Sequence, residues 1–454
     1  MKKWNELSPS NFLKLLFAFF TAAFFLAAVV MPDRGEIFSG LWRIVSNPSK
    51  VSTNYFAEGG YAATFFNAGT VCLVCTLLFA LTGATANAGS SLAFLLTAGF
   101  TFWGIDVLNI WPSFLGVALF CLLRRVPLKE HVNTMLFSTG IAPLVTEMAI
   151  RYPGTEVTGF TWHGIVLALF IGGMIGFFLP AGLSHSPKAH KGYDLYSAAL
   201  PVGLTAFFLR TILYLAPGVE VPAAPSAELL KVASWEITNI FCFVIFGLCI
   251  LAALAMGCRP RHYWCLLKDS GYSADFTKRH GNASMLMNMG VYGLFIVLYY
   301  NLTGATFNGV TFGCIFCMLA CCNSGSHPGN VWPIMAGYVG ASFLFAWISG
   351  VEHGAFSMAI NAQAITVGLC FANGLSPVAG RYGWPAGILA GLMHYCLVTG
   401  VPALHGGFCL YNGGFTAALT CILLVPILET FCKTREERRE LADRKESAGR
   451  SGAN

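Results

Sequence analysis

Two stretches of this chain, 221 positions apart, carry almost the same seven residues. Residues 81–87 read Leu-Thr-Gly-Ala-Thr-Ala-Asn, and residues 302–308 read Leu-Thr-Gly-Ala-Thr-Phe-Asn. At this offset, residues 67–116 match residues 288–337 at fifteen positions without a gap, where chance would give about four for so apolar a composition. Glycine, threonine, asparagine and proline supply much of the match. These residues interrupt helices and bond to free backbone groups, so we infer that one irregular backbone was duplicated.

The duplication continues beyond this block. Phe137, Gly140 and Pro143 recur as Phe371, Gly374 and Pro377. A later run that begins at Pro180 and contains His190, Gly192, Leu195 and Tyr196 recurs from Pro402, with His405, Gly407, Leu410 and Tyr411. One extra apolar segment precedes each repeat. We therefore predict two membrane halves, 1–215 and 234–432, with the repeats near 60–215 and 282–431, and a charged tail at 433–454.

The composition is typical of a polytopic membrane protein. Hydrophobic residues make up 56% of the chain and charged residues only 11%, and the mean hydropathy is +0.65. Apolar windows long enough to cross a bilayer as helices recur throughout, and the alternating segments of a β-barrel do not. The predicted fold class is an all-α transmembrane bundle of about 14 spans. These lie near 12–30, 60–82, 87–108, 111–124, 132–150, 160–183, 194–215, 234–257, 282–302, 307–323, 331–349, 360–380, 383–401 and 412–431.

Basic residues in the loops predict the orientation of these spans. Lysine and arginine gather at 124–129, 188–191, 259–279 and in the tail, and all these segments share one side if every span crosses fully. Seven spans then separate equivalent points of the repeats. The halves would form an inverted seven-plus-seven repeat, with both termini in the cytoplasm. If residues 132–150 dip in and return, the repeats are parallel instead, and the same alternative exists for residues 360–380.

The repeated Thr-Gly-Ala-Thr-x-Asn segment is the first candidate site. Its glycine loosens one helix and its asparagine can start the next. Irregular backbone at membrane depth survives only where protein buries it or it lines a wet cavity, which predicts a solute site that uses helix N-termini. The alternative is a capped turn at the membrane surface. The candidate solute-binding residues are Asn67, Thr82, Thr85, Asn87, Asn288, Thr303, Thr306 and Asn308.

Glycine and proline inside two apolar spans predict discontinuous helices at matching positions. The breaks are expected at Gly140 and Pro143 in one half and at Gly374 and Pro377 in the other, because proline removes a helical hydrogen bond. Discontinuous helices in corresponding positions of two halves point to the central site of a transporter.

Candidate coupling charges are Asp106, Glu147, Arg210 and His327. Asp106 aligns with His327, so one repeat position holds an acid in one copy and a titratable base in the other, an arrangement suited to carrying a proton. At the outer surface the same residues would be ordinary solvated groups. Glu147 lies one helical turn from Arg151. Charges at membrane depth usually pair or serve a pathway, and the alternative is that they snorkel at span ends.

No pattern of a catalyst or a metal site occurs in the sequence. The 16 cysteines lie mostly in apolar runs and are interpreted as small packing residues. The histidines show no metal-ligand spacing, and no Gly-x4-Gly-Lys-Ser/Thr motif exists. We expect no enzyme activity, no metal and no cofactor. The net charge of +6 is a topology signal and does not predict a nucleic-acid partner.

The chain resembles a bacterial family of two-repeat integral membrane proteins classed as a domain of unknown function. The resemblance covers nearly the whole chain, through Leu-Thr-Gly-Ala-Thr-x-Asn, Asn-x-Trp-Pro and Pro-Ala…His-x-Gly…Leu-Tyr, and it implies no substrate. The architecture is also similar to nucleobase and anion carriers with seven-plus-seven repeats, whose sequence motifs are absent here.

We therefore expect a secondary carrier in the bacterial cytoplasmic membrane, which moves a small polar or anionic solute at the interface of the two repeats. The expected partners are the lipid bilayer and an unknown solute, and a homodimer is an open alternative to a monomer. One alternative is a channel for a small solute or ion. Another is a membrane-embedded enzyme that acts on lipid, which would need a convergent His/Asp/Glu cluster.

Overall fold

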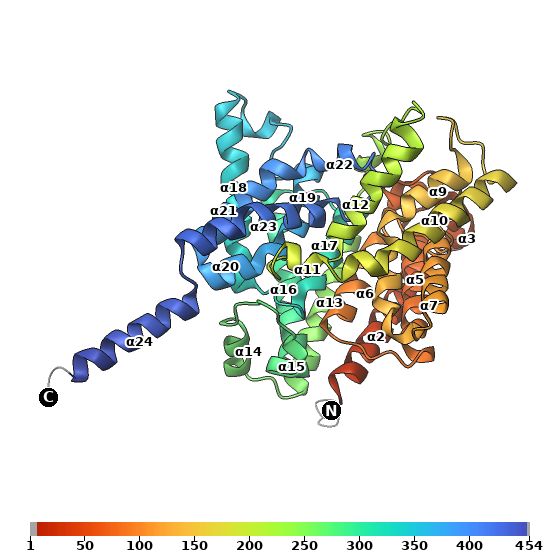
Figure 1. Cartoon of the computed structure of the whole chain (residues 1–454). Helices are drawn as coiled ribbons and strands as arrows, with labels where there is room; N and C mark the ends of the chain where they lie inside the picture. The colour runs from red at the N-terminus through yellow and green to blue at the C-terminus, as the bar shows by residue number, and fades with distance from the viewer. Residues whose placement is uncertain (1–6, 452–454) are drawn as a thin grey trace.

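The computed structural model describes residues 7–451, which fold into helices and connecting turns without any strand (Figure 1). The first six and last three residues of the predicted halves and tail lie outside the described residues. The first half contains α2 (Pro9–Val30), η1 (Arg34–Glu36), α3 (Ile37–Ser46), α4 (Tyr55–Gly59), α5 (Tyr61–Leu81), α6 (Ala88–Phe100), α7 (Trp111–Arg124), η2 (Leu128–Glu130), α8 (Val132–Ser138), η3 (Thr139–Ile141), α9 (Ala142–Ile150), α10 (Trp162–Leu183), α11 (Ser186–Ala189), α12 (Ala199–Arg210) and η4 (Thr211–Leu215).

The second half repeats this order with small differences in length. It contains η5 (Leu229–Lys231), α13 (Trp235–Ala255), α14 (Pro260–Leu266), α15 (Phe276–His280), α16 (Asn282–Thr303), α17 (Gly309–Leu319), η6 (Ala320–Cys322), α18 (Pro328–Ile348), η7 (His353–Ala355), α19 (Gln363–Ala372), η8 (Asn373–Leu375), α20 (Ser376–Tyr382), α21 (Trp384–Val398), α22 (Val401–Leu404) and α23 (Asn412–Phe431), followed by the tail helix α24 (Arg435–Ser451).

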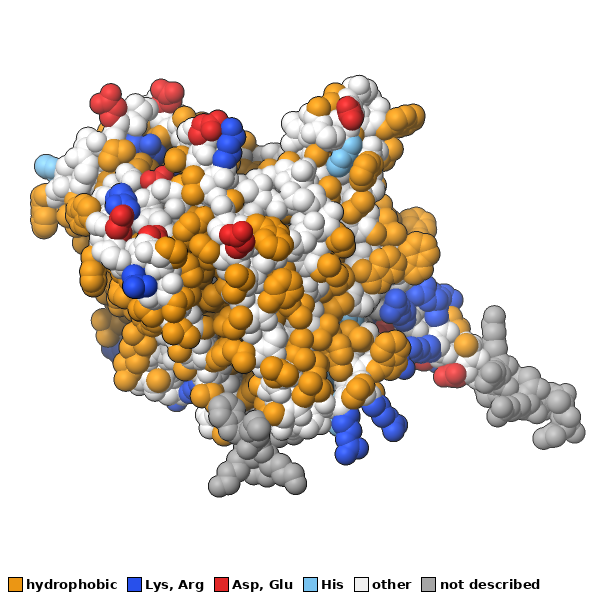
Figure 2. Space-filling model, turned by 180° about the vertical axis from the view of Figure 1, so that it is seen from behind, with side chains coloured by type: hydrophobic (Ala, Val, Ile, Leu, Met, Phe, Trp, Pro, Cys, Tyr) orange, Lys and Arg blue, Asp and Glu red, His pale blue; other side chains and the backbone are white. Residues whose placement is uncertain are grey.

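The protein is a polytopic helical membrane protein. Seven of the described helices are long and apolar enough to cross a bilayer, namely α2, α5, α10, α13, α16, α18 and α23. Figure 2 shows hydrophobic side chains over most of one face, with most charged side chains toward its upper and lower margins. Large apolar side chains such as Leu122, Phe170 and Leu251 are exposed, as expected where lipid replaces water.

Several predicted spans are shorter than a bilayer crossing. All fourteen predicted regions contain helix, but α6 has 13 residues, α7 has 14 and α17 has 11. At 1.5 Å per residue, each reaches about 20 Å at most, whereas the apolar core of a bilayer is about 30 Å thick. Helix α6 ends at a turn that begins at Thr101, and α17 continues through η6 into a turn at Asn323, so neither helix completes a crossing.

The two halves pack in the same internal pattern, which confirms that the fold is duplicated. The extra helix before each repeat packs on the first helix of that repeat, α2 on α5 and α13 on α16. In the same way α7 packs on α10 and α18 on α21, while α6 packs on α8 and α17 on α19. Equivalent residues therefore occupy equivalent environments.

The halves meet where α6 packs against α17 and α12 packs against α23, in the middle of the molecule (Figure 1). Two glycines let the short helices approach closely. A Cβ on Gly99 would lie 2.5 Å from the carbonyl oxygen of Gly313, and a Cβ on Gly313 would lie 2.3 Å from that of Gly99. Backbone contacts backbone here, so no larger side chain fits.

The bundle has two ends, which we name by a helix at each. At the α14 end, low in Figure 1, the Ala86 N–H donates to Ser10 at 2.9 Å and the Asn282 side chain donates to Leu7 O. At the α22 end, high in Figure 1, the Lys50 ammonium donates to Pro222 O and Gly406 O. Helix α2 runs between the two ends, and α24 extends away from the bundle.

Candidate functional site

Both copies of the repeated Thr-Gly-Ala-Thr-x-Asn segment end one helix and cap the next. Gly83 and Gly304 have φ of 69° and 72°, a left-handed conformation that glycine adopts at little cost. The Asn87 side chain accepts from the Ser90 N–H at 3.1 Å, and the Asn308 side chain accepts from the Thr311 N–H at 3.0 Å. Each asparagine forms a capping box with the residue three positions later.

The two copies lie at different ends of the bundle and in different surroundings. Thr85 and Asn87 are exposed and line a cavity of about 290 Å³ at the α14 end, together with Lys129. Asn308 is buried, and its side-chain amide donates to Leu230 O at 2.9 Å and to the Gln363 side chain at 2.6 Å. The copies share their backbone role, and solute binding by either one stays a prediction.

The remaining hydroxyls of the motif bond to their own helices or face outward. Thr82 donates to Leu78 O at 2.6 Å, and Thr303 donates to Tyr299 O at 2.9 Å. Thr306 is exposed at the end opposite to Thr85. These contacts match the capped-turn alternative for the local backbone.

Asn67 and Asn288 hold the turns at the far ends of the short helices. The Asn67 amide donates to Thr101 O and Ile105 O, both at 2.9 Å, and the Asn288 amide donates to Cys322 O and Ser326 O at 2.8 and 2.9 Å. Cys322 and Ser326 are the repeat equivalents of Thr101 and Ile105, so the two amides make the same contacts. Although the sequence groups these amides with Asn87 and Asn308 as candidate solute-binding residues, they lie at the opposite ends of α6 and α17 from Asn87 and Asn308.

Asp106 and His327 occupy equivalent turns that the structure keeps apart. The Asp106 carboxylate accepts from the N–H groups of Leu108 and Asn109, and its second oxygen is buried without a partner among the described residues. His327 Nε2 lies 3.0 Å from Asp269 O. In the part of the chain that the structure describes, no hydrogen bond or ion pair joins the two side chains, so the geometry does not support an acid and a base that act as one pair.

The two helix breaks are connected across the halves. The Leu410 N–H donates to Gly140 O at 2.8 Å, and the Leu195 N–H donates to Gly374 O at 3.0 Å. In each case a turn of one repeat bonds to the broken helix of the other. Short 3-10 turns, η3 and η8, interrupt the two helices where Gly140 and Gly374 lie, and Pro143 and Pro377 begin the helices that follow.

Each break is covered by a tyrosine from the opposite repeat. A Cβ on Gly140 would lie 2.1 Å from Cδ2 of Tyr411, and a Cβ on Gly374 would lie 2.5 Å from Cδ2 of Tyr196. The breaks are therefore points of close contact between the repeats. Glycine is required because the ring occupies the space of a side chain.

Buried charges gather at the α22 end. Glu147 and Arg151 form a two-bond ion pair at 2.6 and 2.7 Å, with side-chain exposures of 0% and 10%. Lys50 is buried, and Arg210 lies against the Gly406 backbone with its Nε buried and without a partner among the described residues. Among the described residues, none of the ion pairs includes Lys50 or Arg210. The cluster therefore has an excess of positive charge.

Burial sets the electrostatics of this cluster. Burial lowers the pKa of Lys50 to about 8, although the Glu147 carboxylate raises it in part. Burial also lowers the pKa of His405, which lies near Arg210, to about 4. At neutral pH His405 is uncharged, and Lys50 remains mostly protonated.

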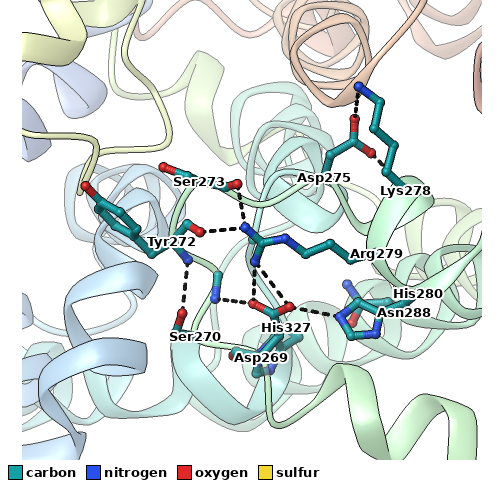
Figure 3. Close-up of polar contacts among 12 residues, drawn as sticks. Asp269, Ser270, Tyr272, Ser273, Asp275, Lys278, Arg279, His280, Asn288 and His327 are labelled. Carbon is teal, nitrogen blue, oxygen red and sulfur yellow. Dashed lines mark hydrogen bonds and ion pairs between the residues drawn. The ribbon is translucent and has the colours of Figure 1, made fainter. Parts of the chain in front are cut away.

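A second charged cluster, at the α14 end, is shown in Figure 3. The Asp269 carboxylate bonds to Arg279 at 3.1 Å, to His280 Nε2 at 2.9 Å and to the Gly271 N–H at 2.9 Å. Arg279 also donates to the carbonyl oxygens of Tyr272 and Ser273. Burial raises the pKa of Asp269, but these partners outweigh it and lower the pKa to about 2. The carboxylate is a fixed anion that ties loop 269–280 together.

Equivalent aromatic rings carry a cation at both ends. The Lys50 ammonium lies 4.9 Å from the ring centre of Phe408, and the Arg381 guanidinium lies 5.7 Å from that of Tyr193 and 4.4 Å from that of Tyr272. Phe408 and Tyr193 occupy the same repeat position, three residues before Tyr411 and Tyr196 of the breaks. Each end of the interface therefore has a cation that lies over an aromatic ring.

Polar side chains converge on the break in the second half. The Tyr196 hydroxyl donates to Cys317 O at 2.7 Å and accepts from the Asn373 amide at 2.6 Å. Ser326 donates to the Asn373 side chain at 2.9 Å and lies 3.0 Å from the Ser376 hydroxyl. This network joins Tyr196 of the first repeat to the broken helix of the second.

Sequence reasoning missed Lys50, Asp194 and the role of Tyr196. Lys50 precedes the first repeat, and its partners Pro222 and Gly406 are distant in sequence, so no local pattern reveals it. Asp194 had a usable signal, because the repeated run places a cysteine, Cys409, at the equivalent position. A position that is acidic in one copy of a duplicated segment and not in the other is a candidate functional site.

A family model described as a protein of unknown function, DUF1576, matches residues 33–215 and again residues 261–430. The two matches cover the two structural repeats, and each match begins before the first long helix of its repeat, α5 or α16. No curated protein and no solved structure matched the chain.

Proposed function

This chain belongs to the DUF1576 family of proteins of unknown function, and from its geometry we propose that it is a secondary carrier for a small anionic or polar solute. The solute site lies at the interface of the two repeats, where α6 crosses α17 and the two broken helices meet. The carrier resides in the bacterial cytoplasmic membrane and works by alternating access.

The exchanged hydrogen bonds at the helix breaks carry this proposal. Leu410 of the second repeat bonds to Gly140 of the first, and Leu195 of the first bonds to Gly374 of the second. Matching discontinuous helices at a repeat interface are the arrangement in which carriers bind solute near the middle of the bilayer. Movement of one repeat against the other would change both breaks together.

The positions of the motif copies support an inverted arrangement of the repeats. Helix α5 ends at the α14 end, where Ala86 bonds to Ser10. Helix α16 ends near Leu230, whose neighbour Leu229 accepts from Asn54 close to Lys50. Equivalent helices would thus run in opposite directions. The basic loops near Lys129, Lys191 and Arg279 gather at the α14 end, which we assign to the cytoplasm together with both termini.

The charges at the α22 end support an anionic solute. Lys50 is buried and Arg210 is half-buried there, and neither forms an ion pair among the described residues, while the buried Glu147 at this end is already paired with Arg151. A buried cation without a counter-ion is costly, and a solute carboxylate or phosphate would supply that charge. Arginine binds such groups through two parallel hydrogen bonds.

A ligand screen followed by uptake assays tests the proposal. Thermal unfolding of the purified protein is measured with a library of small carboxylates, phosphates and neutral metabolites. A ligand is expected to raise the unfolding temperature of the wild type and of Arg210→Lys, and to leave that of Arg210→Gln unchanged. Lys231→Gln is the matched control, because Lys231 pairs with Glu228 on the exposed surface of the same end. The double variant Asn87→Ala with Asn308→Ala tests the repeated motif separately.

Proteoliposome uptake of the ligand then separates the carrier from its rivals. A carrier gives saturable uptake that a trans gradient of the same solute accelerates. Uptake that rises linearly with concentration and shows no counter-flow would indicate a channel. Chemical conversion of the ligand would indicate a membrane-embedded enzyme, and either outcome overturns the proposal.

A further inference from the structure

The two helix breaks have the same backbone, but polar side chains surround the second break and mostly apolar side chains surround the first. The second break brings together Asp194, Tyr196, Cys321, Ser326, Asn373 and Ser376, and the equivalent residues at the first break are Cys409, Tyr411, Phe100, Ile105, Thr139 and Ala142. We propose that the second break binds a monovalent cation, either H+ or Na+, with Asp194 as its anionic group. This inference rests on the proposed function, in which the cation would be the coupling ion.

Asp194 is a buried carboxylate with an unused oxygen. It is 2% exposed, its Oδ1 accepts from the Tyr196 N–H at 2.9 Å, and its Oδ2 has no hydrogen-bond partner among the described residues. It lies against the break itself, since a Cβ on Gly374 would be 2.9 Å from Oδ1. No lysine or arginine of the described part forms an ion pair with it.

The groups around Asp194 do not neutralise it. His190 Nδ1 accepts from the Asp194 N–H at 3.3 Å, and His190 Nε2 lies 2.9 Å from the Ser197 hydroxyl, so the imidazole is neutral. The other ionisable neighbours are Tyr196, Cys321 of η6 and Cys421 of α23, and none of these can carry positive charge. An isolated buried carboxylate is strongly unfavourable, so a proton or a metal cation must compensate it.

Helix ends at the second break favour a cation as well. The Tyr196 hydroxyl lies 2.7 Å from Cys317 O near the end of α17 and 3.1 Å from Cys370 O near the end of α19. Carbonyl groups at helix C-termini carry partial negative charge, and carriers bind Na+ or H+ at such ends of discontinuous helices. The hydroxyl and amide oxygens of Ser326, Ser376 and Asn373 add further oxygen ligands.

The first break serves as an internal comparison. Its tyrosine, Tyr411, is buried with a hydroxyl that has no partner among the described residues. Apolar or weakly polar residues occupy the positions of Asp194, Cys321, Ser326 and Ser376. The backbone can therefore form the break without the polar network, so the network is not needed for folding alone.

Thermal unfolding of the purified full chain, without any solute, tests the cation site. The wild type is compared with Asp194→Asn, which keeps the shape, and with Asp194→Cys, which copies the first repeat and guards against misfolding of the other variant. Asp106→Asn is the matched control, because Asp106 is also a buried carboxylate with an unpartnered oxygen but lies in the α6–α7 turn.

Two arms distinguish the cations. If Na+ binds, replacing choline chloride by sodium chloride at constant ionic strength raises the Tm of the wild type and Asp106→Asn by several degrees, and leaves both Asp194 variants unchanged. If H+ binds, sodium has no effect. The wild-type Tm then falls as pH rises from 5 to 8, relative to Asp194→Asn, because the folded state prefers the protonated carboxyl.

Equal responses of the wild type and both Asp194 variants to sodium and to pH would overturn the inference. The outcome is independent of the carrier test, because no solute is present. If the protein responds to the cation but transports no solute, the cation site is supported and the carrier function is contradicted. If solute uptake depends on neither sodium nor pH, the carrier function is supported and the role of the cation in coupling is contradicted.

Discussion

Asn54 and Asp275 illustrate how single residues were adapted after duplication. They occupy equivalent positions, and each caps a five-residue helix with its side chain. Around Asp275 the second copy added Asp269, Arg279 and His280, a charged cluster that the first copy lacks. The cap depends on a side-chain oxygen that either residue supplies, whereas the cluster depends on charge.

Replacing Asp269 by asparagine is expected to destabilise the protein by about 2 kcal/mol, the typical value of a lost hydrogen bond to a charged group. Asp275→Asn is the matched control and should be nearly neutral, since Asn54 performs the same cap in the first repeat. Thermal unfolding of the purified variants measures both.

The pH dependence of the Asp269 contribution has a defined sign. The pKa of Asp269 is lowered in the folded state to about 2 from 3.8, so the contribution is complete above pH 4 and is lost as pH falls toward 2. A wild type and an Asp269→Asn variant with equal Tm at pH 7 would contradict this account.

At the scale of elements, the breaks in the two discontinuous helices are contact points between repeats. The sequence predicted both breaks from glycine and proline, and the structure shows 3-10 turns at Gly140 and Gly374. The sequence did not indicate that a tyrosine of the opposite repeat covers each glycine. Local backbone chemistry determines where a helix ends, and packing determines what fills the gap.

Gly140→Ala and Gly374→Ala are each expected to destabilise the protein by roughly 1–3 kcal/mol, the usual cost of overpacking. The added Cβ would meet Tyr411 at 2.1 Å or Tyr196 at 2.5 Å. Gly173→Ala in α10 is the control, because nothing lies within 4 Å of its added Cβ. That change should be neutral or stabilising, since alanine favours helix. Similar Tm values for all three variants would argue against the packing described.

At the scale of the whole molecule, duplication produces two ends that are related but not identical. The α22 end holds Lys50 over Phe408, and the α14 end holds Arg381 over Tyr193. The Arg210 and Asp194 variants proposed above test the charge sites of these two ends separately.

Cysteine labelling tests the inverted orientation at this scale. Thr85 and Thr306 are repeat equivalents, and both are exposed. In a background in which the exposed Cys265, Cys396 and Cys432 are replaced by serine, Thr85→Cys should react with a membrane-impermeant thiol reagent only from the cytoplasmic side. Thr306→Cys should react only from the opposite side. Labelling of both from one side would show that the repeats are parallel.

The sequence by itself determined the duplication, the helical membrane class, the capped turns and the helix breaks. These features depend on residues that are neighbours along the chain, where glycine, proline and asparagine control the backbone within a few positions. The same information could not show that α6 and α17 end before completing a crossing, since their apolar runs continue into the following turns.

The tertiary structure alone decided which distant residues meet. Lys50 reaches Gly406, Leu195 reaches Gly374, and Asp194 lies against the second break. Each of these contacts joins segments more than 170 positions apart, and hydrophobic periodicity carries no information about such pairs. Duplication supplied two equal frameworks, and the packing of one against the other created a polar break, an apolar break and two differently charged ends.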